Sequence, residues 1–302
     1  MRVYADNAAT TKVSPKVVEA MIPYMTEGYG NPSSLHSVGQ EAAEHLLEAR
    51  EIMAKALGCQ AREIYFTSGG SEADNQAIRS AAMFGARKGK KHIISTAFEH
   101  HAVLHTLQKL EKEGFEVTYL DVKTNHNITA HQVKDAIRPD TCLVTVMYAN
   151  NEIGTIEPLK EIGAIAKEHQ ILFHTDAVQA YGQVPINVDE LNIDMLSSSG
   201  HKINGPKGIG FLYIRKGVKI RSFVHGGAQE RKRRAGTENI PAIVGYGAAV
   251  ERAICTMKER TEKEMELRDY MINRVLEEIP YTKLNTLSIE DLMLETTKFR
   301  VI

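Results

Sequence analysis

The most informative segment of the chain is residues 197–208, which read Ser197-Ser198-Ser199-Gly200-His201-Lys202-Ile203-Asn204-Gly205-Pro206-Lys207-Gly208. The segment follows an apolar run typical of a buried strand, and its residues are small, polar and prone to turns. Such a loop lets the backbone approach an anion closely. An arbitrary lysine is usually a surface side chain, but in this setting Lys202 can form a Schiff base with a carbonyl cofactor.

A carboxylate precedes this lysine at the end of the strand predicted over Ile171–Thr175. Taken alone, Asp176 would be an ordinary polar residue at a strand end. Pyridoxal 5′-phosphate (PLP), a cofactor that forms a Schiff base with lysine, needs a carboxylate opposite its pyridine nitrogen to keep the ring an electron sink. The pairing of Asp176 with Lys202 therefore indicates a PLP site, with Gln179 three residues further on near enough to reach the ring hydroxyl.

A glycine-rich turn, Ser68-Gly69-Gly70-Ser71-Glu72, lies between a predicted strand and a predicted helix. Helix N-termini expose N–H groups and a partial positive charge, and glycine lets a phosphate come close. The turn is neither a Walker A motif nor a dinucleotide-binding fingerprint, because it lacks the residue order of both. A single phosphate monoester fits it better, and a plain capping turn is the alternative.

The histidine pair His100-His101 follows another predicted strand. A zinc site needs more ligands at short spacing, and His105 alone does not supply them, so no metal site is predicted. An imidazole that stacks on a pyridine ring and moves protons is the sharper hypothesis for His100.

Short apolar runs alternate with amphipathic stretches along most of the chain, which indicates an α/β fold with a mostly parallel sheet between helices. Seven strands are predicted, over residues 64–67, 92–95, 115–120, 141–148, 171–175, 195–198 and 209–214. Helices are predicted over residues 15–28, 38–57, 72–85, 101–113, 130–137, 158–169 and 242–278, the last with a possible bend. Polar clusters follow five of the strands, and ligands bind at the carboxyl ends of parallel strands. We therefore expect those clusters to form one site.

The composition and net charge limit the kinds of partner that we expect this protein to bind. Hydrophobic residues make up 43% and charged residues 25% of the 302 residues, and the net charge is −1. A long-range attraction to nucleic acid or to an anionic membrane is not expected. The three cysteines are widely spaced, no apolar run approaches the length of a membrane span, and the N-terminus shows no signal peptide, so a cytoplasmic protein is predicted. The basic cluster Arg231-Lys232-Arg233-Arg234 is either a solvated loop or a loop that binds an anion or a second subunit.

Together these residues resemble the cysteine desulfurases (NifS/IscS-type) of the class V aminotransferase group, which are PLP enzymes of fold type I. The resemblance runs from residue 1 to about residue 284 and rests on many motifs in order. They are Tyr4–Thr11, Gly30–His36, Phe66–Glu72, Asn150–Gly154, Ser199–Lys202, Gly205–Gly208 and Arg234–Thr237.

The resemblance implies a role for each matching position. Lys202 would bind the cofactor covalently, Asp176 would pair with its pyridine nitrogen, and His100 would stack on its ring. Asn151 and Gln179 would contact the ring hydroxyl. The phosphate would be held by Gly70, Ser71, Ser199 and His201, and Thr237 would reach the phosphate of the other subunit in a homodimer. The catalytic residues would thus be Lys202, His100 and Asp176.

The implied reaction converts L-cysteine to L-alanine and enzyme-bound sulfur for iron–sulfur cluster or thio-cofactor assembly, with a sulfur-acceptor or scaffold protein as a further partner. Three parts are expected: an N-terminal arm (1–13), a large PLP-binding domain (14–245) and a truncated small C-terminal domain (246–302). The family's cysteine loop and substrate-carboxylate arginine are not recognisable before residue 302, and residues 286–302 show none of the small domain's strands. Cys59, Cys142 and Cys255 match no such loop. Full activity of this chain is therefore doubtful, and a selenocysteine lyase, an aminotransferase or a non-catalytic dimerising homologue stay as alternatives.

Overall fold

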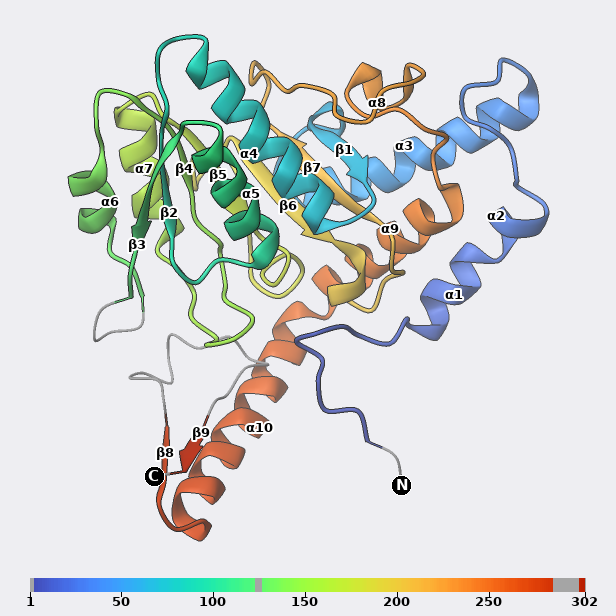
Figure 1. Cartoon of the computed structure of the whole chain (residues 1–302). Helices are drawn as coiled ribbons and strands as arrows, with labels where there is room; N and C mark the ends of the chain where they lie inside the picture. Colours follow the sequence, from blue (N-terminus) through green and yellow to red (C-terminus); the bar gives the residue numbers. More distant parts are fainter. Residues whose placement is uncertain (1–2, 123–126, 285–298, 302) are drawn as a thin grey trace.

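The computed structural model describes residues 3–122, 127–284 and 299–301, and its centre is a seven-stranded sheet (Figure 1). The strands in spatial order are β1 (Ile64–Thr67), β7 (Gly210–Ile214), β6 (Met195–Ser199), β5 (Leu172–Asp176), β4 (Thr141–Thr145), β2 (His92–Thr96) and β3 (Glu116–Leu120). The strands from β6 to β3 run parallel, and β7 is antiparallel to both β6 and β1. The predicted fold class, a mostly parallel seven-stranded α/β sheet, is confirmed.

Helices cover both faces of the sheet. The helices of the main body are α1 (Pro15–Met21), α2 (Pro23–Thr26), α3 (Ser37–Leu57), α4 (Gly70–Ala86), α5 (His101–Lys112), α6 (Ala130–Ala136), α7 (Leu159–Glu168) and α9 (Ile240–Cys255). Neighbouring residues of a strand belong to different cores: Tyr65 packs with α4 and α5, whereas Ile64 and Phe66 pack with α3 and α9. This alternation is the two-residue period of a strand buried on both faces.

Local sequence signals set the helix ends. Gly58 closes α3 in a left-handed conformation, with φ of 68°, as the sequence predicted. Pro23 divides the first predicted helix into α1 and α2. The long helix predicted over residues 242–278 is two helices, α9 and α10 (Met257–Glu278), separated at Thr256.

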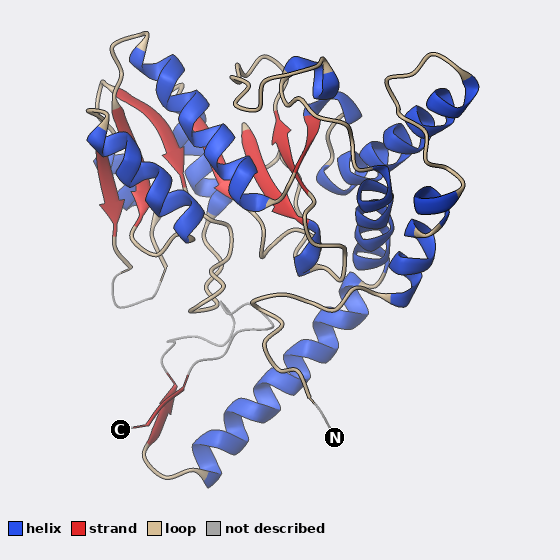
Figure 2. Ribbon diagram, turned by 45° about the vertical axis from the view of Figure 1, so that its right-hand side comes forward, coloured by secondary structure: helices blue, strands red, loops and turns tan. Residues whose placement is uncertain are grey.

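Helix α10 leads away from the sheet and ends in a small hairpin (Figure 2). The hairpin pairs β8 (Thr282–Leu284) with β9 (Phe299–Val301), so the expectation of no strand after residue 285 was wrong for β9; residues 286–298 lie outside the described part. Helix α9 packs along α3, and residue 246 lies within it. The domain division at residue 246 stays a prediction. Among the described residues, no helix is long and apolar enough to cross a membrane.

The basic cluster is bound to the chain's own body. It includes the end of α8 (Gln229–Lys232), and the guanidinium groups of Arg231 and Arg233 lie 4.2 and 4.5 Å from the ring centroid of Tyr65. Arg234 Nε donates to Glu72 Oε1 at 2.9 Å. The simple solvated-loop interpretation is therefore wrong for Arg233 and Arg234, which are partly buried, whereas Arg231 is exposed although it contacts the body of the protein. The anion-binding and subunit-contact interpretations stay predictions.

A buried ion pair anchors this segment. Glu230 has a left-handed backbone, with φ of 42°, although it is not glycine. Its carboxylate accepts from Arg50 Nη1 at 2.8 Å, Arg50 Nη2 at 2.7 Å and the Phe66 N–H at 2.9 Å. The two side chains of the pair are only 7% and 2% exposed. A strained backbone persists where surrounding bonds over-determine it, and these three bonds do so here.

We predict that Glu230→Ala lowers the free energy of unfolding by about 3–5 kcal/mol, because it leaves the buried Arg50 guanidinium without a counter-charge. Urea denaturation of the cofactor-free protein measures the loss. Glu266→Ala is the control; it removes an exposed ion pair with Lys263 and should change stability by less than about 1 kcal/mol. A Glu230→Ala loss no larger than that of the control would contradict the role of the pair.

Candidate active site

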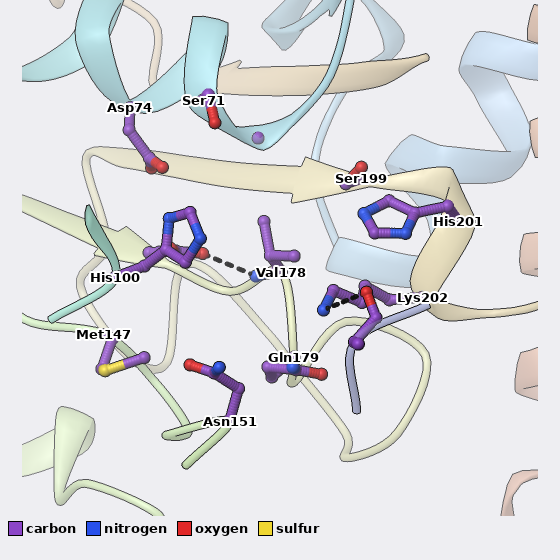
Figure 3. Close-up of a pocket in the computed structure, with 13 residues that line it drawn as sticks. Ser71, Asp74, His100, Met147, Asn151, Val178, Gln179, Ser199, His201 and Lys202 are labelled. Atoms are coloured by element: carbon purple, nitrogen blue, oxygen red, sulfur yellow. Dashed lines mark hydrogen bonds between the residues drawn. The ribbon is translucent and has the colours of Figure 1, made fainter. Parts of the chain in front are cut away.

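A cavity of about 240 Å³ lies at the carboxyl ends of the parallel strands (Figure 3). Its lining comprises Ala9, Gly70, Ser71, Asp74, His100, Met147, Asn151, Asp176, Val178, Gln179, Ser199, His201 and Lys202. Nine of the ten predicted site residues are in this lining. The structure thus brings together side chains from α4, the loop before α5, and the loops after β4, β5 and β6, as expected for an open parallel sheet.

The tenth predicted residue, Thr237, is exposed and does not line this cavity. That position is compatible with its predicted role toward the phosphate of a second subunit, which stays a prediction.

Lys202 ends a single 3₁₀ turn, Gly200–Lys202, directly after β6. Its Nζ donates to the backbone carbonyls of Ala8 and, at 3.1 Å, Ala9. The neighbouring His201 is also bound to the N-terminal arm, with Nδ1 3.0 Å from Thr10 Oγ1. The arm therefore forms one wall of the cavity and holds the lysine amine at its edge.

Asp176 closes the cavity at the end of β5 and is 4% exposed. Burial raises the pKa of its carboxyl, while the Val178 N–H, which donates to Oδ1 at 2.8 Å, and the nearby His100 and Lys202 lower it. A second carboxyl, Asp74 from α4, is 1% exposed. The oxygens of both acids and a ring nitrogen of His100 lie within 4.8 Å of one another.

His100 is the N-cap of α5, and its Nδ1 accepts from the Ala102 N–H at 3.1 Å. The cap fixes the imidazole above the two acids, where the stacking role was predicted. The preceding residue, Glu99, is buried and accepts from Thr96 Oγ1 at 2.9 Å and from the Met147 N–H at 2.8 Å. Burial raises the pKa of Glu99 to about 8.

The start of α4 forms the opposite end of the cavity. Gly70 is the first residue of this helix, and a Cβ added there would lie 2.5 Å from Val178 Cγ2. A larger residue would therefore displace either the helix start or the loop after β5. The N–H groups of the first helical turn are free of intrahelical partners and carry the positive end of the helix dipole. Ser71, Ser199 and His201 surround this end.

The imidazole of His201 is half-buried. Burial, with the positive charges of Lys202 and Lys207, lowers its pKa to about 4. His201 is therefore neutral at pH 7 and can donate or accept one hydrogen bond toward the cavity.

Gln179 and Asn151 line the remaining side. Gln179 Nε2 donates to the Ala8 carbonyl at 2.8 Å, so the amide that was predicted to contact a ring hydroxyl also binds the N-terminal arm. Asn151 sits in a turn that Asn150 fixes, because Asn150 Oδ1 accepts the N–H groups of Glu152 and Ile153 at 2.6 and 2.8 Å.

Sequence reasoning missed four lining residues: Ala9, Asp74, Met147 and Val178. Asp74 carried a usable signal, because it is an acid on the helix face that contains Gly70, Ala73 and Ala77. An acid on a face of such small residues is unusual enough to suggest a site. The other three line the cavity through backbone or apolar groups, and such groups give no distinctive signal in a sequence.

The residues fit PLP on three structural grounds. Asp74 Oδ1 is buried without a hydrogen-bond partner among the described residues, and the buried Asp176 lies next to it, so the floor of the cavity suits a further positive charge. A protonated pyridine nitrogen would bring that charge and could donate to Asp176. The helix start at Gly70 suits a phosphate, and Lys202 lies at the cavity edge between the two.

Comparisons with known proteins identify the family of the chain. The model of the aminotransferase class-V family matches residues 3–301, which extends the family resemblance beyond residue 284. The cysteine desulfurase IscS of Methanosarcina thermophila is 58% identical over 283 residues, which cover 94% of this chain and 70% of that protein.

Solved structures show the same fold. A NifS-like protein has a TM-score of 0.96 at 40% identity, covering all of this chain and 82% of the other. SspA in complex with cysteine has a TM-score of 0.80 at 47% identity, covering 83% of this chain and 72% of the other. The chain therefore belongs to the class-V aminotransferase family, and within this family of PLP-dependent enzymes to the cysteine desulfurases.

Proposed function

We propose that the cavity binds PLP with Lys202 as its covalent attachment point, and that the loaded site takes the sulfur from L-cysteine. The single observation that carries this proposal is the convergence of Lys202, the buried Asp176 and the start of α4 on one cavity. When bound, the cofactor supplies a protonated pyridine ring that withdraws electrons from the substrate's Cα. Binding of cysteine by the similar SspA supports the choice of substrate.

Each residue that lines the cavity would have its own role in binding the cofactor or in catalysis. Asp176 would pair with the ring nitrogen and keep a proton on it. The α4 N-terminus with Ser71, Ser199 and His201 would hold the phosphate, and His100 would cover the ring and move protons at its Nε2, since its Nδ1 is engaged at the helix cap. The Ala8 and Ala9 carbonyls orient the Lys202 amine, which must leave them to react.

Sulfur transfer also needs a thiolate. No cysteine lines the cavity within the described residues. Burial raises the pKa of the Cys59 thiol to about 12 and that of Cys142 to about 11, so both are poor nucleophiles at pH 7. We infer that the accepting thiol comes from outside the described residues, and that a sulfur-acceptor or scaffold protein for iron–sulfur assembly receives the sulfur.

We also infer a homodimer and a cytoplasmic location. Thr237 is exposed and does not line the cavity of its own chain. A residue that contacts the phosphate bound in a second subunit has to be placed in this way. The three free cysteines suit a reducing compartment.

Removal of the attachment point tests cofactor binding. We predict that Lys202→Ala abolishes the visible absorption band that forms when PLP is added to the purified protein. Lys216→Ala, an exposed lysine outside the cavity, should keep the band. Equal bands in both variants would show that the cofactor is attached elsewhere.

Removal of one phosphate ligand tests the helix start. Hydrogen bonds to charged groups contribute about 1.5–3 kcal/mol, so Ser71→Ala should weaken PLP binding by at least about tenfold. Pyridoxal, which lacks the phosphate, should bind the variant and the wild type equally. Titration of the absorption band with each compound measures the two affinities, and an equal loss for both would place the phosphate away from Ser71.

The reaction is tested with L-cysteine and dithiothreitol as the accepting thiol. The loaded protein should release alanine and sulfide, and Lys202→Ala should not. Formation of an amino acid from an added 2-oxo acid without sulfide would favour an aminotransferase. A loaded protein that forms neither product would be a non-catalytic homologue, and a strong preference for L-selenocysteine would indicate a selenocysteine lyase.

A further inference from the structure

Three buried carboxyl groups surround the floor of the cavity: Asp74, Glu99 and Asp176. Asp74 and Asp176 lie so close that their oxygens fall within 4.8 Å of one another. Two carboxylates at this distance, shielded from water, cannot both stay ionised without a counter-charge. The distribution of protons among the acids therefore sets the charge that the cavity offers to a ligand.

The surroundings of Asp176 favour its ionised form. Its Oδ1 accepts the Val178 N–H at 2.8 Å, and His100 and Lys202 stand near enough to lower its pKa against the effect of burial. A backbone donor and nearby cations stabilise a carboxylate more than a carboxylic acid.

The surroundings of Asp74 favour its protonated form. Its Oδ1 has no hydrogen-bond partner among the described residues. The Ser197 hydroxyl donates to the carboxyl and lowers its pKa, but this effect is smaller than that of burial. His174 Nε2 lies 3.7 Å away, but burial lowers the pKa of His174 to about 3, so it brings no positive charge at pH 7. The nearby negative charge of Asp176 raises the pKa of Asp74 further, beyond the larger effect of burial.

Glu99 adds no second negative charge to the floor of the cavity. It is 4% exposed, and one of its oxygens, Oε2, has no hydrogen-bond partner among the described residues. Its neutral form therefore predominates near pH 7, in accord with its raised pKa.

We propose that Asp74 stays protonated beside an ionised Asp176, so that the floor of the cavity presents one negative charge, from Asp176, to the cofactor's ring nitrogen. Asp74 is then a positioning residue that acts through Asp176. The proposal rests on the cofactor site described above, but the protonation of Asp74 is a property of the cofactor-free protein and is measured there.

Infrared difference spectroscopy of the cofactor-free protein at pH 7 tests the proposal directly. A protonated carboxyl has a C=O stretch that a carboxylate lacks. Asp74→Asn should remove one such band from the wild-type spectrum, and the matched variant Asp176→Asn should retain it. Loss of the band in Asp176→Asn alone, or in neither variant, would overturn the assignment. If Asp74→Asn does not fold, titration of the ¹³C-labelled aspartate carboxyls in the wild type decides the same question.

The pH dependence of stability is a second readout. A carboxyl whose pKa is raised in the folded state binds more protons there than in the unfolded chain, so its contribution is lost as the pH rises through the folded pKa. As the pH rises above about 4, the ordinary aspartate pKa, the melting temperature of the cofactor-free wild type should therefore fall more steeply than that of Asp74→Asn, by at least about 2 °C. Parallel profiles would mean that Asp74 is already ionised and would overturn the proposal. Neither measurement uses PLP, so a failure of cofactor binding remains distinguishable from a failure of this inference.

Discussion

The parallel pairing of β5 with β6 is the constraint on which the site depends. Its register sets Asp176 opposite Ser197. Two residues after Ser197 the chain leaves the sheet, and the turn that carries Lys202 begins with the Gly200 N–H bound to the Ile209 carbonyl at 3.0 Å. A shift of one residue would turn Asp176 to the other face of the sheet. The acid and the lysine turn therefore meet because two neighbouring strands end together.

The N-terminal arm, which forms one wall of the cavity, is hydrogen-bonded to the same turn. Thr11 Oγ1 donates to the His201 carbonyl at 2.7 Å and accepts from the Asn204 N–H at 2.8 Å, so the N-terminal arm follows the lysine loop. The buried Arg50–Glu230 pair and the buried acids of the cavity differ in kind. Arg50 and Glu230 neutralise each other and serve stability, whereas the acids at the cavity floor lack an equivalent partner within the described chain and leave room for a cationic ligand.

Sequence reasoning could predict the sheet and most of the site because both depend on local signals. Short apolar runs located the strands, and residues such as Asp176 and Ser199 were found because they sit at strand ends. The contacts of the N-terminal arm could not be predicted, since Ala8 and Ala9 act through backbone carbonyls that every residue has. The helix face of small residues could have drawn attention to Asp74, but its closeness to Asp176 on β5 could not be predicted from helix periodicity. The break at Thr256 was expected only as a bend, because no proline or glycine marks it.

The central claim is that this fold places one lysine, Lys202, where the cofactor is attached. Borohydride reduction of the PLP-loaded protein fixes the linkage permanently, and peptide mass spectrometry then locates it. We expect a phosphopyridoxyl group on the peptide that contains Lys202 and on no other lysine at stoichiometric yield. Modification of a different lysine, with Lys202 unmodified, would contradict it.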